Sequence, residues 1–250
     1  MIEYPQILSF GGGVNSAALA IMAINDGWRG DIVFSDTGCE HPETYCWIEY
    51  FEREYLSRYG LSVTRLGPEQ QHQNENPAKF GPMSLIDYCE QHGIIPMASV
   101  RWCTINWKVL PMDAYSGDRT QMLGIAADEA HRQRDKVRPL VDRHITRKGC
   151  IEIIEAAGLD VPQKSGCYIC PFQRDSQWRT LWERHPELFE RAARLEESVQ
   201  RTKAGRTRAT LDPSGKVTLR QRELSYTSQI ELPDFDMDAL LAYQPCICTL

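Results

Sequence analysis

The amino-acid sequence predicts an α/β fold in which a parallel, twisted sheet carries helices on both faces. Short apolar runs alternate along the chain with stretches of helical periodicity. Such alternation is typical of parallel strands joined by right-handed helical crossovers. In addition, a glycine-rich turn joins the first apolar run to the first helical stretch. We therefore expect ligands to bind beyond the carboxyl ends of the strands, where the loops of such sheets converge.

The first half of the chain supplies the predicted sheet. Apolar runs with the length of buried strands fall at residues 6–9, 31–35, 61–66 and 121–125. Helical patterns lie between them at residues 16–26 and 44–59. The loops that follow three of these strands should meet in one crevice, and they comprise residues 11–16, 36–41 and 124–132. Residues 67–82 are polar and poorly periodic, which predicts a mobile loop or lid.

The second half predicts a helical region with a basic segment. Helices are expected at residues 151–157, ended by Gly158, and at residues 176–184 and 187–200, with Pro186 in the first turn of the last. Residues 201–222 contain seven basic side chains and one acid. Within this segment, 207–211 and 216–219 alternate like an exposed hairpin around a turn at 212–215. We expect two domains, residues 1–172 and residues 173–250.

Composition is that of an ordinary globular protein. The chain has 250 residues, 42% hydrophobic and 25% charged, with a net charge of −6 from 28 basic and 34 acidic residues. This balance gives no global reason to bind nucleic acid or a membrane surface. No apolar run is long enough to span a bilayer and no signal-like segment opens the sequence. We therefore expect a cytoplasmic protein without membrane contact.

The glycine-rich turn has the form of a phosphate-binding loop. Three glycines, Gly11, Gly12 and Gly13, connect an apolar run to a helical pattern through a turn that ends at Ser16. Backbone N–H groups and the positive end of a helix favour an oxyanion there, and glycine allows close approach. The turn lacks the Gly-Lys-Ser/Thr of a Walker A loop and the usual Gly-x-Gly-x-x-Gly spacing. A purely structural glycine turn is the alternative.

Nine cysteines are numerous for a cytosolic protein, in which metal or catalytic roles are favoured over disulfides. Cys46 and Cys89 lie in helical patterns and are expected to pack as small hydrophobic residues. Cys167 and Cys170 form a Cys-x-x-Cys turn that lets two thiolates face one metal or cluster. Cys103 and Cys150, flanked by basic residues, bring the candidate ligands to four. An iron–sulfur cluster, a structural zinc site, a redox dithiol and unrelated free thiols are the interpretations.

Several motifs together resemble the phosphoadenosine phosphosulfate reductase family of the PP-loop ATP pyrophosphatase superfamily. The resemblance covers residues 9–172 and is nearest to the iron–sulfur branch of phage-type homologues and DNA-phosphorothioation sulfurtransferases. The motifs that carry it are 9–16 (SFGGGVNS), 36–44 (DTGCEHPET), 101–104 (RWCT) with 108–111 (KVLP), 124–132 (GIAADEAHR), 138–140 (RPL) and 164–172 (KSGCYICPF). Their common order along the chain makes the resemblance specific.

The resemblance implies an adenine nucleotide alpha hydrolase-like fold that binds ATP or an adenine sulfonucleotide. The loop would hold the phosphates, and residues 36–38 would lie near the adenosine part. The expected nucleotide-binding residues are Ser9, Gly11, Gly12, Gly13, Asn15, Ser16, Asp36, Thr37, Gly38 and Gly124. The resemblance also implies that a 4Fe-4S cluster beside this site is held by Cys103, Cys150, Cys167 and Cys170.

Two departures from the family pattern affect the chemistry. The usual loop reads Ser-Gly-Gly-x-Asp-Ser, whereas this chain has Gly11 in place of the serine and Asn15 in place of the acid. The missing carboxylate removes a group that helps to place Mg²⁺, so nucleotide binding is better supported than ATP turnover. Reductase members often carry a double cysteine where this chain has Trp102 and Cys103, which leaves Cys150 as the candidate fourth ligand.

The first hypothesis for the reaction is adenylation. An acceptor oxygen would attack the α-phosphate of ATP, pyrophosphate would leave, and a sulfur or nitrogen nucleophile would then displace AMP. Lys108 and Arg132 are expected to add charge at the transferring centre, with Asp128 as a further catalytic candidate. The acceptor is a nucleic acid gripped by residues 201–222, or a small molecule. A solvated hairpin is the alternative role for that basic segment.

Two further hypotheses keep the fold. One is reduction of a sulfonucleotide by Cys246 or Cys248, although the chain end lacks the Glu-Cys-Gly-x-His setting of reductases. The other is a non-catalytic, nucleotide-binding iron–sulfur sensor or assembly subunit. The acceptor, the sulfur or electron donor and the formation of a homo-oligomer are left open by the sequence.

Overall fold

The computed structural model describes residues 4–67, 83–132, 136–202 and 210–228. The predicted lid at 67–82 therefore lies almost wholly outside the described residues. The same holds for the thiols of Cys246 and Cys248 and for the first part of the predicted hairpin.

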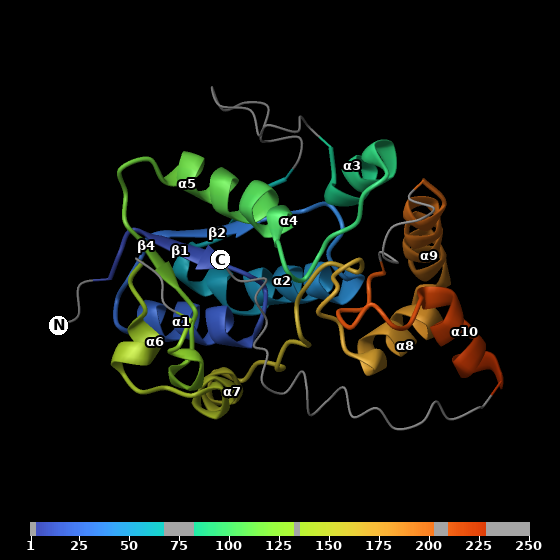
Figure 1. Cartoon of the computed structure of the whole chain (residues 1–250). Coiled ribbons are helices and arrows are strands. Elements are labelled where there is room, and N and C mark those ends of the chain that lie inside the picture. The colour runs from blue at the N-terminus through green and yellow to red at the C-terminus, as the bar shows by residue number, and fades with distance from the viewer. Residues whose placement is uncertain (1–3, 68–82, 133–135, 203–209, 229–250) are drawn as a thin grey trace.

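A four-stranded parallel sheet forms the centre of the N-terminal region, as predicted (Figure 1). Its strands are β1 (Ile7–Phe10), β2 (Asp31–Ser35), β3 (Val63–Leu66) and β4 (Gln121–Leu123), in the order β3-β2-β1-β4. β1 pairs with β2 on one side and with β4 on the other. β2 and β3 lie on one side of β1, and β4 lies on the other. The loop that follows β1 therefore lies at a topological switch point, where such sheets bind ligands.

Helices cover both faces of the sheet (Figure 1). On one face lie α1 (Val14–Asn25) and α2 (Pro42–Glu54), and on the other lies α5 (Leu110–Ser116). Successive strand residues point to opposite faces. Leu8 and Phe10 accordingly pack with the helices of the first face, whereas Ile7 packs with Met112 of α5. This arrangement confirms the predicted fold class.

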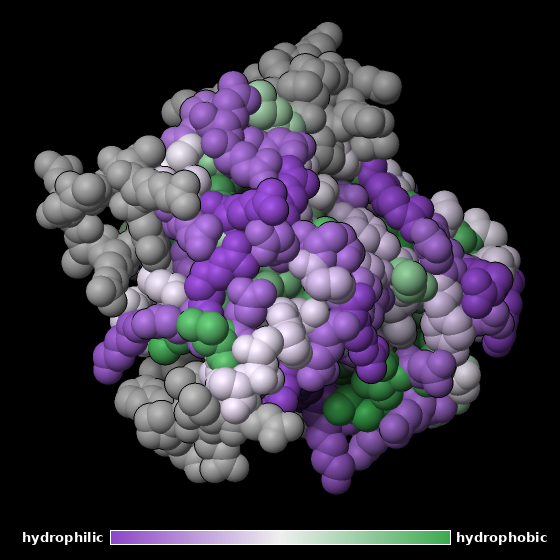
Figure 2. All heavy atoms as spheres, turned by 90° about the vertical axis from the view of Figure 1, so that its right-hand side faces the viewer, coloured by the Kyte–Doolittle hydropathy of each residue, from purple (hydrophilic) through white to green (hydrophobic). Residues whose placement is uncertain are grey.

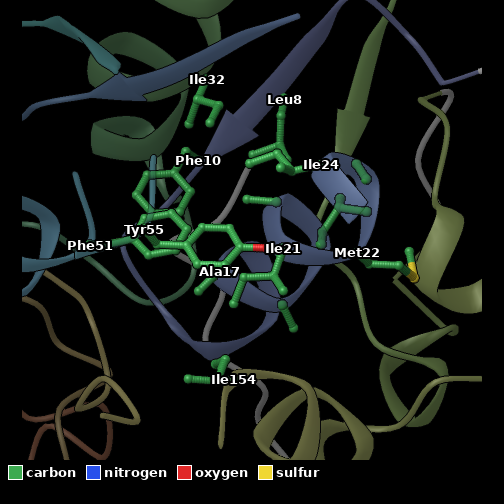
Figure 3. Close-up of a cluster of buried hydrophobic side chains, with 14 of the residues drawn as sticks. Leu8, Phe10, Ala17, Ile21, Met22, Ile24, Ile32, Phe51, Tyr55 and Ile154 are labelled. Atoms are coloured by element: carbon green, nitrogen blue, oxygen red, sulfur yellow. The ribbon is translucent and has the colours of Figure 1, made fainter. Parts of the chain in front are cut away.

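The core on the α1–α2 face is built from aliphatic side chains and stacked aromatic rings (Figure 3). The Phe51 ring stacks on Phe10 and on Tyr55, with centroid distances of 5.7 and 5.6 Å. Ile21 and Ile24 of α1 line the same core. α1 is buried along nearly its whole length because a second helix, α7 (Arg147–Ala156), covers its outer side.

The remaining helices surround this centre. They are η1 (Leu56–Tyr59), α3 (Leu85–His92), α4 (Trp102–Thr104), η3 (Ile105–Val109), η4 (Ala127–Glu129), α6 (Pro139–Asp142), α8 (Asp175–Arg184), α9 (Pro186–Thr202) and α10 (Leu219–Ser228). α8 and α9 confirm two of the predicted helices, including Pro186 at the start of α9. The predicted helix at 44–59 is divided into α2 and η1.

A second hydrophobic cluster joins the C-terminal helices to the sheet region. Trp178 of α8 and Phe189 of α9 belong to the same cluster as Leu85 and Trp107. In addition, Arg191 of α9 forms ion pairs with acids of α3. The boundary predicted at residue 172 thus crosses a continuous core.

The hairpin predicted for 207–219 is wrong in its described part. Residues 216–218 form no strand, and α10 begins at Leu219. The buried carboxylate of Glu196 accepts hydrogen bonds from the backbone N–H groups of Leu211 and Leu219, both at 2.7 Å. It thereby fixes the two ends of the 212–215 turn against α9. A pattern of alternating residues does not reveal such a long-range anchor.

The helix predicted at 151–157 begins earlier than expected. α7 starts at Arg147 because the Thr146 side chain caps it by accepting from Gly149 N at 3.4 Å. Cys150 therefore lies inside the helix rather than before it. Gly158, with a φ of +74°, follows the end of the helix as predicted.

None of the helices in the described ranges is long and apolar enough to span a membrane. The face formed by α8, α9 and α10 is largely hydrophilic, and apolar side chains occur there in small, separate patches (Figure 2).

Candidate functional site at the glycine-rich loop

The glycine-rich loop leads from the end of β1 into the first turn of α1. Gly12 has a φ of +66°, a conformation that L side chains rarely adopt. The Ser16 hydroxyl accepts from Gly11 N at 3.2 Å and donates to Gly13 O at 3.0 Å, which closes the loop. Among the described residues no side chain caps α1 and none of its first-turn residues is acidic. The positive end of the helix is therefore left for an anion.

Two close approaches hold this loop in place. A Cβ on Gly124, just after β4, would stand 2.7 Å from the backbone N and Cα of Ser16. A Cβ on Gly13 would stand 2.7 Å from the Ser165 hydroxyl. The loop is thus held between the end of β4 and the segment 162–172, which explains the need for glycine at both positions.

A small pocket opens at the loop, and we call it the loop pocket. It is lined by Gly13, Val14, Asn15, Ser16, Glu129, Arg147, Lys164 and Ser165. Backbone N–H groups, two cations, two hydroxyls and one carboxylate therefore surround one space. The N–H groups, cations and hydroxyls are donors that suit phosphate oxygens. Arg147, Lys164 and Ser165 were missed as binding residues in the sequence because their approach to the loop depends on α7 and on the segment 162–172.

A polar network connects the loop to Glu129. Asn15 Nδ2 donates to Glu129 Oε2 at 3.2 Å, and Arg147 Nη1 donates to Asn15 Oδ1 at 3.4 Å. Arg132, predicted as a catalytic cation, is buried and donates to the same Glu129 oxygen at 3.1 Å. Asp128, the other catalytic candidate in this loop, is exposed and instead accepts from Arg147 N at 3.1 Å. Glu129, not Asp128, is thus the carboxylate of the loop pocket.

A second pocket, here the thiol pocket, contains cysteines and cations. Its lining includes Thr37, Arg101, Cys103, Lys108, Cys167, Cys170 and Phe172. Arg101 has a left-handed φ of +51° and its guanidinium lies 5.2 Å from the Phe172 ring centroid. The π-helical turn η3 brings Lys108 into the same pocket. Helical turns of this kind occur frequently at functional sites.

Lys108 is held by a buried carboxylate in this region. Lys108 Nζ lies 2.9 Å from Glu40 Oε1, and the two side chains are only 8% and 1% exposed. Thr37 Oγ1 donates to the same carboxylate oxygen, and Cys167 Sγ lies 3.5 Å from it. Within the described part of the chain, Glu40 Oε2 is buried without a hydrogen-bond partner. Lys108, predicted to add charge at the transferring centre, thus forms a buried ion pair beside the thiols and does not line the loop pocket.

Three thiols of this region have raised pKa values, those of Cys39, Cys103 and Cys167. Burial raises the pKa of Cys103 to about 11. A hydrogen bond with Cys39, together with burial, raises the pKa of Cys167 above its ordinary value. Burial also raises the pKa of Cys39. A protonated thiol is a poor nucleophile and a poor metal ligand.

The four cysteines predicted as cluster ligands do not fit one four-thiolate cluster in this structure. Cys103, Cys167 and Cys170 line the thiol pocket, but Cys150 packs in the core beside α1. Cys39 and Cys89 belong to the hydrophobic cluster of the thiol pocket instead. Throughout the ranges 4–67, 83–132, 136–202 and 210–228, no group of three or more His, Cys, Asp or Glu side chains is arranged to hold a metal ion. Cys89 is buried as predicted, whereas Cys46 is exposed.

The loop after β2 is organised by Asp36. Asp36 Oδ1 accepts from Gly38 N at 2.8 Å and from the Tyr45 hydroxyl at 2.6 Å, while burial raises the pKa of the carboxyl. Thr37 reaches the thiol pocket, and Gly38 is exposed with a φ of +70°. Ser9 lies within β1, where it pairs with Val33 and Leu123. These residues shape the strand ends around the loop.

Two arginines of the predicted basic segment, Arg220 and Arg222, are paired with acids. Arg220 forms ion pairs with Glu190, Glu197 and Glu223. Arg222 is buried and pairs with acids at positions 175 and 212. Arg206 and Arg208 lie outside the described residues. Arg220 and Arg222 therefore hold the C-terminal helices together.

Comparison with known proteins gives a family match and distant relatives. Residues 5–143, more than half of the chain, match the family model described as phosphoadenosine phosphosulfate reductase domain. Uncharacterized protein MJ0066 of Methanocaldococcus jannaschii is 24% identical over 215 residues, 76% of this chain and 41% of that protein. Uncharacterized nin region protein ORF290 of Escherichia phage lambda is 30% identical over 152 residues, 52% of this chain and 51% of that protein. The chain spans about half the length of these curated relatives, and no solved structure gives a significant match.

Proposed function

The chain belongs to the phosphoadenosine phosphosulfate reductase domain family, and from this premise we propose that it is an enzyme that binds ATP or a related adenine nucleotide and activates an acceptor by adenylation for sulfur transfer. The observation that carries the proposal is the loop pocket. It combines the uncapped N-terminus of α1 with Arg147, Lys164 and Ser165 around one space. This donor set suits a polyphosphate rather than a neutral ligand.

The loop would act on the leaving group. In adenylation an acceptor oxygen bonds to the α-phosphorus while the bond to the β-phosphate oxygen breaks, and pyrophosphate leaves with the negative charge. The N–H groups at the loop and the two cations would stabilise that charge as it develops. A sulfur nucleophile would then displace AMP from the acceptor. The acceptor and the sulfur donor are proposed only by these chemical classes.

The thiol pocket would serve the sulfur step because it shares a wall with the loop pocket. Lys164 and Ser165 line the loop pocket, and residues 169–172 line the thiol pocket. Lys164 Nζ also donates to Phe172 O at 3.1 Å, which ties the two ends of the wall together. A sulfur group in the thiol pocket would therefore lie beside the activated acceptor.

Reduction of an adenine sulfonucleotide is the second candidate, and the cysteines of the thiol pocket favour it. A thiolate would attack the sulfate sulfur, AMP would leave, and a second thiol would release sulfite from the sulfonated cysteine. The raised pKa values of Cys103 and Cys167 disfavour this route at neutral pH. Sulfite formation from adenosine phosphosulfate would favour it over adenylation.

The proposal is tested by nucleotide binding followed by turnover. We expect ATP to bind in titration calorimetry, and Lys164→Ala and Arg147→Ala each to weaken binding about tenfold because a charge-assisted contact is lost. Lys148→Ala is the matched control, since that lysine is 87% exposed and does not line the loop pocket. Pyrophosphate release with candidate acceptors then tests adenylation. Tight ATP binding without pyrophosphate release would support a non-catalytic nucleotide sensor, and absence of ATP binding would refute both.

A further inference from the structure

A further pocket, here the histidine pocket, adjoins the glycine-rich loop, the start of α2, the segment 162–164 and α8. Its lining includes Gly12, His41, Glu43, Thr44, Lys164 and Thr180. Gly13, the next residue of the loop, lines the loop pocket, and Lys164 lines both pockets. The histidine pocket is therefore a neighbour of the loop pocket.

His41 is fixed in this pocket by Gln173. The His41 residue is only 9% exposed, and its Nε2 lies 2.8 Å from Gln173 Oε1. The buried Gln173 side chain donates through Nε2 to Tyr168 O at 2.8 Å, which turns its Oε1 towards the imidazole. An amide oxygen can only accept a hydrogen bond, so the proton of the neutral ring lies on His41 Nε2.

The other ring nitrogen, Nδ1, is then a bare acceptor. Burial lowers the pKa of His41 below its ordinary value, which favours the neutral ring. In the part of the chain that the structure describes, no hydrogen bond reaches Nδ1, and Nδ1 is not one of the fully buried atoms that lack a partner. It is therefore open to the pocket that His41 lines. A neutral imidazole with a fixed tautomer can take a proton from a bound group.

The surrounding groups make the histidine pocket rich in acceptors. Glu43 brings a carboxylate, whose Oε1 accepts from His185 Nε2 at 2.9 Å. The Thr180 hydroxyl donates to Ser176 O at 2.9 Å, which leaves its oxygen lone pairs as acceptors. A carboxylate ligand would face the charge of Glu43 and the lone pair of Nδ1. The pocket therefore suits an uncharged group that brings an N–H or O–H donor.

We propose that the histidine pocket binds the acceptor of the adenylation reaction, that this acceptor is an alcohol or an amide rather than a carboxylate, and that His41 Nδ1 takes its proton. This inference rests on the proposed function and names its substrate class. Neither the sequence motifs nor the family match assigns a role to His41. Gln173 becomes a positioning residue, because its amide fixes the tautomer of the ring.

The step transfers one proton and one adenylyl group. The O–H or N–H proton of the acceptor passes to Nδ1 while the acceptor oxygen bonds to the α-phosphorus. The bond from the α-phosphorus to the β-phosphate oxygen breaks, and pyrophosphate leaves with its electron pair. The Glu43 carboxylate would stabilise the positive charge that the ring gains, and the ring then returns its proton to water.

The alternative is that His41 only fastens the start of α2 to the turn that contains Gln173. The two roles differ in what the ring does with a ligand. A structural ring does not respond to a donor in the pocket, and its substitution affects stability alone. A proton-accepting ring responds to donors but not to carboxylates.

The first test is NMR of the histidine ring nitrogens in the full chain, with acetamide and acetate as probes. We expect His41 to show a protonated Nε2 and a bare Nδ1. Acetamide, which carries N–H donors, should shift the Nδ1 resonance, and acetate should not. His92 is the internal control, because it does not line the pocket and its Nδ1 donates to Tyr88 O at 3.0 Å, which is the opposite tautomer.

Two variants separate the nitrogen from the shape of the ring. His41→Phe keeps a ring without Nδ1, so acetamide affinity should fall about three- to tenfold, the worth of one neutral hydrogen bond. Gln173→Leu removes the amide that fixes the tautomer, so His41 should show both tautomers and acetamide affinity should also fall. His92→Phe, at an exposed histidine of α3, is the matched control and should keep the affinity.

Turnover links the pocket to the reaction. Candidate acceptors are compared as matched amides and carboxylates, and we expect only the amides to release pyrophosphate from ATP. His41→Phe should lower this release about 10²–10⁴-fold, the usual contribution of a catalytic base, while ATP affinity stays unchanged. Release that is driven by carboxylates, or that His41→Phe leaves intact, would overturn the inference.

The outcomes separate this inference from the proposed function. If ATP binds but acetamide leaves the Nδ1 resonance of His41 unmoved, or acetate moves it equally, the inference is overturned and nucleotide binding stands. A proton on Nδ1 of the neutral ring overturns it as well. If ATP does not bind, the proposed function fails, and the role of His41 in adenylation fails with it. Should His41→Phe not fold, the tautomer and probe measurements on the unmodified protein still decide.

Discussion

At the scale of single residues, the site depends on where a side chain is absent as much as on where one is present. Gly124 and Gly13 let two other segments touch the loop, and Gly12 provides its left-handed turn. Asn15 and Glu129 are a case in which the side chains themselves matter. The Asn15 amide donates to the Glu129 carboxylate, so each side chain holds the other in place. Close approach is thus the property that fixes residue type around this loop.

Replacement of Gly124 by alanine should destabilise the protein. The new Cβ would meet backbone atoms of Ser16 at 2.7 Å, and neither β4 nor α1 can move away cheaply. We expect the free energy of unfolding to fall by about 1–3 kcal/mol, the usual cost of overpacking. Urea denaturation measures it. An unchanged midpoint would show that the two elements are not held in contact.

The buried pair of Lys108 and Glu40 predicts a non-additive pair of substitutions. Lys108→Met leaves a carboxylate buried without its cation, and we expect a loss of about 3–5 kcal/mol in the free energy of unfolding. Lys108→Met combined with Glu40→Gln should recover most of that loss because no charge remains buried. Urea denaturation of both single variants and of the double variant completes the cycle. Additive losses would contradict the ion pair.

The sequence predicted the residues of the loop far better than their partners. Gly11–Ser16 are adjacent, so local spacing alone reveals a loop of this form. Glu129 and Lys164 reach it from distant positions, and no local pattern separates Glu129 from its neighbour Asp128. For the same reason Cys150 was grouped with thiols that lie in another core. Spacing identifies neighbours along the chain, whereas these contacts depend on the packing of whole elements.

At the scale of elements, hydrophobic periodicity was sufficient for the sheet and for α8 and α9, and insufficient for α10. β2 occupies the predicted residues 31–35, because a strand buried on both faces is a continuous apolar run. α10 was not predicted, and only its first residue, Leu219, fell within the predicted hairpin. The position of this helix depends on Glu196 and on ion pairs with α9. Charged contacts between helices leave no periodic signal in the sequence.

The contact between α9 and α10 should weaken in acid. Arg220 and Arg194 lower the pKa of Glu190 from 4.5 to about 2. Because the folded-state pKa is depressed, the stabilisation is present above the ordinary value of 4.5 and is lost as the pH falls towards about 2. Trp182 packs against Tyr226 of α10 at 5.6 Å, so its fluorescence should report the release of the helix. In Glu190→Gln the fluorescence change in this pH range should be smaller, and an identical acid transition in that variant would exclude Glu190 as its cause.

At the scale of the whole molecule, the buried apolar side chains of the described residues form two large hydrophobic clusters. One cluster fills the space between the sheet and α1, α2 and α7. The other joins α3 and the thiol pocket to α8, α9 and α10. The cysteines of the thiol pocket therefore belong to the cluster that the C-terminal helices complete.

A chain that ends at Phe172 should not fold as a stable unit. It would lose Trp178, Leu181 and Phe189, which cover Leu85 and Trp107 in the second cluster. We expect the full chain to unfold in one transition, and the shortened chain to bind a hydrophobic dye and to be digested rapidly by proteases. A chain that ends at Ser228 keeps all of these contacts and is the control. A cooperative transition in the chain ending at Phe172 would instead establish an autonomous N-terminal domain.

The shared wall between the two pockets has a consequence for how this protein can change over evolutionary time. Lys164 faces one pocket while its ammonium is bonded to the carbonyl of Phe172 in the lining of the other. We expect a substitution in this wall that adjusts one pocket to shift the other as well. Mutations at residues 162–172 should therefore be strongly epistatic, and new specificities in this lineage should arise through paired replacements rather than single ones.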